Sequence, residues 1–135
     1  MSVFFDTNVL IYAEDSRDEA KRSRAIDIVR TAMRAADGVV STQVLQEFYV
    51  NAVRRLTMPK ERAQARTRLY QSLVVVPVTP ELIQSAIDLH RLEPLSFWDA
   101  LVLRAAGSAG CTTLYSEDVQ AGRVFDGVRV VNPFG

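Results

Sequence analysis

The sequence contains a single cysteine, Cys111, and a single histidine, His90. A single cysteine excludes an intramolecular disulfide. With one cysteine and one histidine in all, the chain also has too few ligands for a zinc site built from Cys and His. A triad of serine, histidine and acid would depend on His90, which lies beside the apolar helical stripe of Ile83 and Ala86 and is expected to be a helix border residue. Catalysis by this chain must therefore rest on other side chains.

Long apolar runs and a glycine-rich phosphate loop are also missing. No apolar run approaches the ~20 residues that cross a bilayer. Residues 1–6 have no basic flank and reach an acid at once, unlike a signal peptide. The 16 basic and 16 acidic residues cancel, so net charge does not indicate a nucleic-acid partner. We expect a protein of the reducing cytoplasm that does not enter a membrane.

The length of 135 residues and the hydrophobic content of 48% fit one domain with a sizeable core, spanning 1–135. Short apolar runs predict strands at 3–5, 38–41, 73–78, 112–115 and 128–131. Most of these runs are continuous rather than alternating, which is typical of parallel strands buried on both faces. Helical periodicity between them predicts an α/β three-layer sandwich with a central, mainly parallel sheet of about five strands.

Four acids stand out from this pattern: Asp6, Glu47, Asp99 and Asp118. Asp6 directly follows the run 3–5, and Asp118 comes shortly after the strand expected at 112–115. Open parallel sheets bind ligands at the carboxyl ends of their strands. Both acids are therefore predicted at the edge of the sheet where such folds bind ligands.

Helix capping is the competing explanation for three of these positions. Residues 6–8 are an Asp, a Thr and an Asn, which all cap well, although a cap needs only one of them. Ser96, three residues before Asp99, resembles a capping box with Asp in place of Glu. Asp99 is flanked by apolar residues, and because a buried charge needs compensation we favour a ligand role for it. Ser116 is a candidate cap of a short helix, and spacing does not separate Glu117 from Asp118.

Glu47 is the acid with the weakest signal. It falls off the apolar stripe of its helix and aligns instead with Asn51 and Arg54, at i+4 and i+7. That position alone indicates an exposed glutamate with an arginine near it.

Clustered carboxylates favour a bound cation. Two carboxylates ~5 Å apart repel by roughly 3 kcal/mol at an effective dielectric of ~20. A fold that gathers three or four of them needs a divalent cation or raised, coupled pKa values. Oxygen ligands suit Mg²⁺ or Mn²⁺, and such sites commonly act on phosphate esters.

One stretch of the chain is strongly basic. Only Glu61 opposes its six cations, which are Arg54, Arg55, Lys60, Arg62, Arg66 and Arg68. This excess predicts contacts with RNA phosphates or with an acidic partner segment; the alternative is the solvated surface of a helix pair. Trp98 and the tyrosines are expected in the core rather than as platforms for base stacking.

Four segments together resemble the PIN-domain family, and in a chain this short they resemble its VapC toxins. They are Asp6-Thr7-Asn8-Val9-Leu10, Glu47 isolated on a helix, Phe97-Trp98-Asp99-Ala100-Leu101, and Leu114-Tyr115-Ser116-Glu117-Asp118. The resemblance covers essentially the whole chain. Each motif is weak alone, and their order and spacing carry the comparison.

The resemblance implies a Mg²⁺- or Mn²⁺-dependent endoribonuclease that cleaves RNA with metal-activated water. The implied catalytic acids are Asp6, Glu47, Asp99 and Asp118. Asp6, Asp99 and Asp118 are the implied metal ligands, and Glu47 ligates a metal or orients water. Supporting polar residues are Thr7, Asn8 and Ser116, with Glu117 extra to the set. The family also implies a homodimer and inhibition by a small antitoxin protein.

Other functions fit less well. A haloacid-dehalogenase phosphatase needs a second acid two residues after the first, where this chain has Asn8. A receiver domain needs a late lysine, and Lys21 and Lys60 are the only lysines. Two alternatives stay open within the PIN class: a housekeeping RNA-processing or flap nuclease, and an inactive PIN fold that serves as a binding module.

Overall fold

A six-stranded sheet with the order β3-β2-β1-β4-β6-β5 forms the centre of the molecule. The structure is a computed structural model and describes residues 2–135; Met1, the first residue of the predicted domain, lies outside them. The strands are β1 Val3–Phe5, β2 Gly38–Ser41, β3 Val74–Val76, β4 Thr113–Tyr115, β5 Val124–Phe125 and β6 Val128–Val131. Neighbouring strands are parallel except for β5, which pairs with β6 in antiparallel register.

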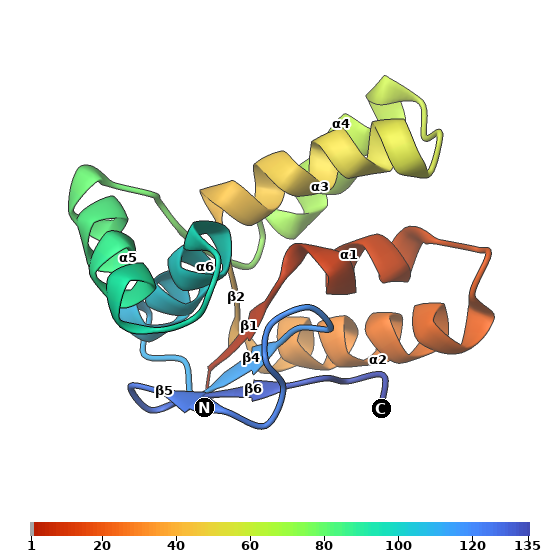
Figure 1. Cartoon of the computed structure of the whole chain (residues 1–135). Coiled ribbons are helices and arrows are strands. Elements are labelled where there is room, and N and C mark those ends of the chain that lie inside the picture. The colour runs from red at the N-terminus through yellow and green to blue at the C-terminus, as the bar shows by residue number, and fades with distance from the viewer. Residues whose placement is uncertain (1) are drawn as a thin grey trace.

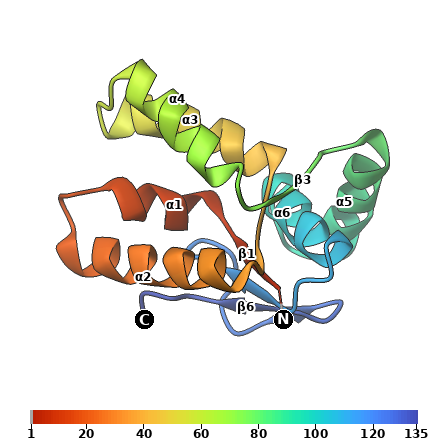
Figure 2. The same ribbon diagram turned by 180° about the vertical axis from the view of Figure 1, so that it is seen from behind.

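Six helices surround this sheet (Figure 1). They are α1 Thr7–Glu14, α2 Glu19–Ala35, α3 Thr42–Arg55, α4 Lys60–Tyr70, α5 Pro80–Leu92 and α6 Phe97–Ser108. The α1–α2 pair and the α5–α6 pair lie on opposite sides of the sheet, which confirms the predicted three-layer α/β sandwich. Figure 2 shows from behind that α3 and α4 form a hairpin that projects past the sheet on the side of α1.

The core explains why the strands are continuous apolar runs. Phe4 and Phe5 of β1 are fully buried, although they point to opposite faces of the sheet, because helices cover both faces. Leu114 of β4 and Val40 of β2 are also fully buried. In residues 2–135 no helix is both long enough and apolar enough to cross a membrane.

Two strand predictions need correction. The sequence predicts no strand at Val124–Phe125, yet β5 forms there and makes a sixth strand; two residues are too few for a periodic pattern. The strand expected at 73–78 is shorter, because only 74–76 pair with β2 before Pro77, which has no N–H to donate.

β1 lies at the point of the sheet that best suits a binding site. It pairs with β2 on one side and with β4 on the other, so the chain order reverses across it. The carboxyl ends of these strands lead directly into α1, α3 and the loop after Tyr115. At such a reversal the connecting segments diverge and leave a crevice.

Candidate functional site

Asp6 joins the end of β1 to the start of α1. Its backbone N–H donates to Tyr115 O of β4 at 3.0 Å, and its Oδ1 caps α1 by accepting from Thr7 N at 2.8 Å. Its Oδ2 accepts from Ser116 Oγ at 2.7 Å. The side chain is therefore fixed by the first residue of α1 and by the residue that follows β4, and the cap uses only one of its two oxygens.

Thr7 connects Glu47 to this first acid. The Thr7 hydroxyl donates to Glu47 Oε1 at 2.7 Å, although the two residues are 40 positions apart in the chain. Because α3 packs on α1, Glu47 comes to the end of β1. The expectation from spacing alone, an exposed helix glutamate, is wrong: Glu47 is half-buried in the site.

Asn8 and Ser116 hold the fourth acid. Asn8 Nδ2 donates to Asp118 Oδ2 at 3.1 Å, and Asn8 Oδ1 accepts from the Glu117 backbone N–H at 3.2 Å. Ser116 Oγ accepts from the backbone N–H groups of Asp118 and Val119, each at 3.2 Å. These bonds shape a bend at 117–119, and the short helix considered there does not form.

Asp99 enters from the opposite side of the sheet, in the first turn of α6. Ser96 is the N-cap, and its Oγ accepts from the Asp99 backbone N–H at 3.0 Å. The cap therefore uses the main chain of Asp99, which leaves its carboxylate to face the site.

All four acids line one cavity of about 170 Å³. Thr7 and Asn8 line it as well, while Ser116 lies fully buried behind Asp6. The four predicted positions, which come from β1, α3, α6 and the loop after β4, thus meet at the carboxyl end of the sheet.

The electrostatics of the cavity agree with this convergence. Burial raises the pKa of Asp6 to about 6, with further increases from the charges of Glu47 and Asp99, while bonds from Ser116 and Thr7 oppose the rise. Burial also raises the pKa of Asp99, and the charges of Asp118 and Glu47 raise it further. A side-chain hydrogen bond with Ser96 partly opposes this rise. The acids therefore repel one another through the cavity, and a cation between them would relieve that repulsion.

The donor set suits a hard divalent cation. Carboxylate and amide oxygens are the ligands that Mg²⁺ and Mn²⁺ prefer. Within residues 2–135, no three Asp, Glu, His or Cys side chains converge closely enough to form a complete metal cage. Mg²⁺ commonly binds through one or two carboxylates and keeps several waters, so one or two of Asp6, Asp99 and Asp118, completed by waters, would be enough to hold such an ion.

Glu117, which spacing does not separate from Asp118, lies away from the cavity. Its Oε2 accepts from Lys21 Nζ at 2.6 Å and its Oε1 accepts from Tyr12 Oη at 2.8 Å. Lys21 also lies over the rings of Tyr12 and Phe134, at 4.6 and 5.6 Å from their centroids. Glu117 therefore ties the loop after β4 to α1 and α2.

The basic residues do not form one surface. Arg55 lines the acid cavity, whereas Arg66 is half-buried and pairs with Glu14 at 2.7 Å beside Tyr70. Arg62 and Arg66 line a different cavity, of about 410 Å³, between α2 and α4. The remaining cations of the set are exposed: Arg54, Lys60 and Arg68.

Sequence reasoning missed three polar residues of the acid cavity and assigned Trp98 to the wrong environment. Gln43 and Asn51 line the cavity from α3, and neither was singled out as a site residue because an amide in a helix carries no distinctive pattern. Arg55 was assigned only to the basic stretch. Trp98 is not a core residue as expected: its side chain is 60% exposed and lines the cavity.

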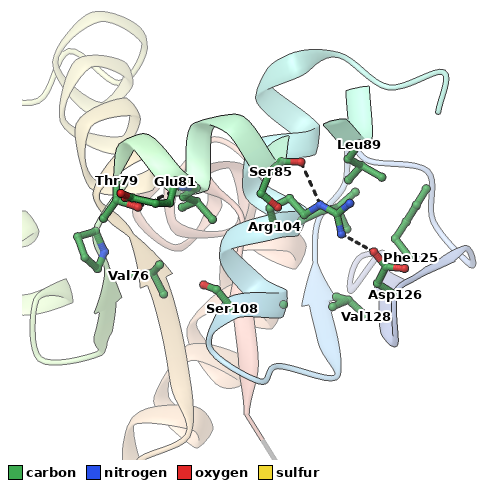
Figure 3. Close-up of a pocket in the computed structure, with 14 residues that line it drawn as sticks. Val76, Thr79, Glu81, Ser85, Leu89, Arg104, Ser108, Phe125, Asp126 and Val128 are labelled. Carbon is green, nitrogen blue, oxygen red and sulfur yellow. Dashed lines mark hydrogen bonds and ion pairs between the residues drawn. The ribbon is translucent and has the colours of Figure 1, made fainter. Parts of the chain in front are cut away.

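A larger cavity, of about 610 Å³, contains none of the four acids. It lies between α5, α6 and the turn from β5 to β6 (Figure 3). Arg104 crosses it, donating to Ser85 O at 3.3 Å and pairing with Asp126.

His90, the single histidine, lies at the end of α5 away from the acids. Its Nδ1 contacts Leu95 O at 2.6 Å, which agrees with its expected position at the border of a helix.

Comparison with known proteins gives a family match over most of the chain. The protein-family model described as "PIN domain" matches residues 3–125 of the chain. No curated protein sequence matches the chain significantly.

Solved structures share the fold. VapC20 of Mycobacterium tuberculosis, described as a toxin that cleaves the sarcin-ricin loop, is 25% identical, with a TM-score of 0.67 over 88% of this chain and 92% of its own. A chain of a toxin–antitoxin complex from Klebsiella pneumoniae is 21% identical, with a TM-score of 0.68 over 98% of both chains. A chain of the Rickettsia felis VapBC2 complex bound to promoter DNA is 14% identical, with a TM-score of 0.68 over 96% of this chain and 97% of its own.

Proposed function

Since this chain belongs to the PIN-domain family, we propose that it is a metal-dependent endoribonuclease acting as the toxin of a toxin–antitoxin pair. The observation that carries this proposal is the convergence of Asp6, Glu47, Asp99 and Asp118 on one cavity. These acids come from four separate parts of the chain, and a fold has no structural need to gather four carboxylates. The similarity to VapC20, whose description names an RNA-cleaving toxin, gives independent support.

The four acids would have different roles in the reaction. Asp6, Asp99 and Asp118 are the residues that would hold Mg²⁺ or Mn²⁺, and when bound such a cation supplies Lewis-acid activation of the phosphate and of water. Glu47, which accepts a hydrogen bond from the Thr7 hydroxyl, would ligate the same ion or orient water. The attacking group is water, so no nucleophilic side chain is required.

The surrounding residues keep the acids in place. Ser116 and Asn8 bond to Asp6 and Asp118 respectively, which fixes the two strand-end acids relative to each other. Groups that orient metal ligands matter for metal affinity nearly as much as the ligands themselves. Thr7, Asn8 and Ser116 are therefore positioning residues of the site.

An antitoxin is the partner that this function requires. Similar structures include toxin–antitoxin complexes. The acidic cavity suits an inserted Arg or Lys of such a partner. The separate cavity between α2 and α4 offers apolar contacts at Ile26, Val29 and Leu69, beside arginines. We expect residues 1–135 to form one nuclease domain. We also expect two copies of the chain to form a homodimer that acts in the cytoplasm.

RNA cleavage tests the proposal. Purified protein should cut single-stranded RNA in the presence of Mg²⁺ or Mn²⁺, EDTA should stop the cleavage, and added metal should restore it. The resemblance to the PIN family implies products with 5′-phosphate and 3′-hydroxyl ends, and water as the nucleophile leaves no 2′,3′-cyclic phosphate. Cleavage that persists in chelator, or products with 2′,3′-cyclic phosphates, would contradict the mechanism.

A further inference from the structure

Trp98 is the exposed aromatic residue at the acid cavity. It is the only tryptophan of the chain, and 60% of its surface is exposed although most apolar residues of α6 are buried. Its ring meets the ring of Phe97 edge-on, with centroids 5.1 Å apart and planes at 74°. A large aromatic side chain left in water beside a functional cavity is typical of a surface that a ligand covers.

Gln43 provides a second observation in the same cavity. Its side chain is buried, with a residue exposure of 6%, and its Nε2 donates to Trp98 O at a long 3.5 Å. Within residues 2–135, Gln43 Oε1 is a buried side-chain polar atom without a hydrogen-bond partner. Buried acceptors are rarely left unpaired in native proteins. Because Gln43 lines the acid cavity, a small rotation of its amide would bring the unpaired oxygen to a donor on a bound molecule.

A positively charged side chain also lines the cavity. Arg55, in the last turn of α3, lines it together with Trp98 and Gln43. The three side chains offer an aromatic face, an open hydrogen-bond acceptor and a guanidinium group. A nucleotide has a complementary group for each, which are its base, its hydroxyl or amino donors, and its phosphate.

We propose that Trp98 and Gln43 form a nucleotide subsite in the acid cavity, where the indole stacks on a nucleobase beside the scissile phosphate and Gln43 Oε1 accepts a hydrogen bond from the same nucleotide. This inference rests on the proposed function, because it names how that site holds its RNA. Stacking accepts any base, so Trp98 contributes affinity, while the single acceptor of Gln43 selects nucleotides with a donor in reach.

The unique tryptophan makes the subsite directly measurable. In an Asp6→Asn background that suppresses cleavage, a mixed-sequence RNA of about 12 nucleotides is titrated in Mg²⁺ while Trp98 emission is recorded. Saturable quenching is expected. RNA affinity, measured with end-labelled RNA, should fall by roughly tenfold in Trp98→Ala and less in Trp98→Phe. Gln43→Met should weaken binding while the emission of the complex stays quenched.

Leu92→Ala is the matched control, because Leu92 is 79% exposed on α5 and does not line the cavity. Melting temperatures of all variants show whether the fold is kept. If Trp98→Ala and Leu92→Ala bind RNA equally tightly while the wild type cleaves RNA, the subsite is overturned and the proposed function stays intact. A Trp98→Ala variant that loses self-association with unchanged RNA affinity also overturns it, since the face would then serve a second copy. A wild type that neither binds nor cleaves RNA removes the proposed function itself.

Discussion

At the scale of single residues, Asp6 combines burial with a charge. It is 7% exposed, it caps α1, and it accepts from Ser116. Those bonds favour the ionised form, yet burial and the neighbouring acids outweigh them and bring its pKa to about 6. The metal-free protein therefore carries an unfavourable charge at neutral pH, which a cation would compensate.

This raised pKa predicts a pH dependence of stability. Between the ordinary aspartate pKa near 3.8 and about 6, the folded state holds a proton that the unfolded state has released. The free energy of unfolding should therefore decrease as pH rises through this range, by about 3 kcal/mol from this residue. Asp6→Asn has no such titration, so in EDTA its melting temperature should exceed that of the wild type at pH 8 and match it near pH 4.

Asp88→Asn serves as the control for this measurement, because Asp88 is exposed on α5 and far from the cavity in the fold. Its melting temperature should follow the wild type at every pH. An Asp6→Asn variant that is less stable than the wild type at pH 8 would mean that the carboxylate is chiefly a structural cap.

Asp99→Asn separates ligation from capping at the start of α6. The cap bond uses the backbone N–H of Asp99, which the substitution keeps, so the metal-free fold should be as stable as before or more stable. Cleavage should fall by more than about 100-fold, since even groups that only support metal ligands are worth roughly 10- to 100-fold. A loss of about 1 kcal/mol in stability with activity retained would be the signature of a cap alone.

The sequence located the acids but not all of their surroundings. Asp6 and Asp118 were predictable because each follows a short apolar run, and such a run that ends near an acid indicates the end of a buried strand. Spacing did not indicate Glu47, which was predicted from the family resemblance alone, since its place depends on how α3 packs on α1. Gln43 has no pattern of its own, and Trp98 was assigned to the core because hydrophobicity does not show that a residue lies at a cavity mouth.

At the scale of elements, the loop after β4 is held from outside the site. Lys21 pairs with Glu117, and both contact Tyr12, while the next residue of the loop is Asp118. Lys21→Gln should therefore lower metal affinity and cleavage by roughly tenfold with little change in melting temperature, because the pair is partly solvent-exposed. Lys21→Arg should retain most of both.

Lys60→Gln is a suitable control for this loop, since Lys60 is exposed at the start of α4. Equal metal affinity in Lys21→Gln and Lys60→Gln would show that Asn8 and Ser116 hold Asp118 without outside help.

The order of strands and helices was readable from the sequence because both faces of the sheet are covered. Continuous apolar runs marked β1, β2, β4 and β6 within a residue of their bounds. β5 was missed, since two residues beside Gly122 and Gly127 look like a turn, and the antiparallel pairing with β6 depends on tertiary contacts.

At the scale of the whole molecule, the proposed toxin should arrest growth when it is expressed alone. Expression together with the adjacent small open reading frame should restore growth, because the partner would fill the acidic cavity with a cation and cover apolar surface. Asp99→Asn expressed at the same level should be harmless. A harmless wild type that still cleaves RNA in vitro would favour the RNA-processing alternative.

The most direct test of the account is Mn²⁺ binding measured by titration calorimetry, because it needs no knowledge of the RNA target. The wild type should bind Mn²⁺, and Asp6→Asn, Asp99→Asn and Asp118→Asn should each weaken the binding by at least about tenfold, while Asp88→Asn leaves it unchanged. Equal affinity in all of these proteins, or no binding by a folded wild type, would contradict the claim that Asp6, Asp99 and Asp118 hold a divalent cation.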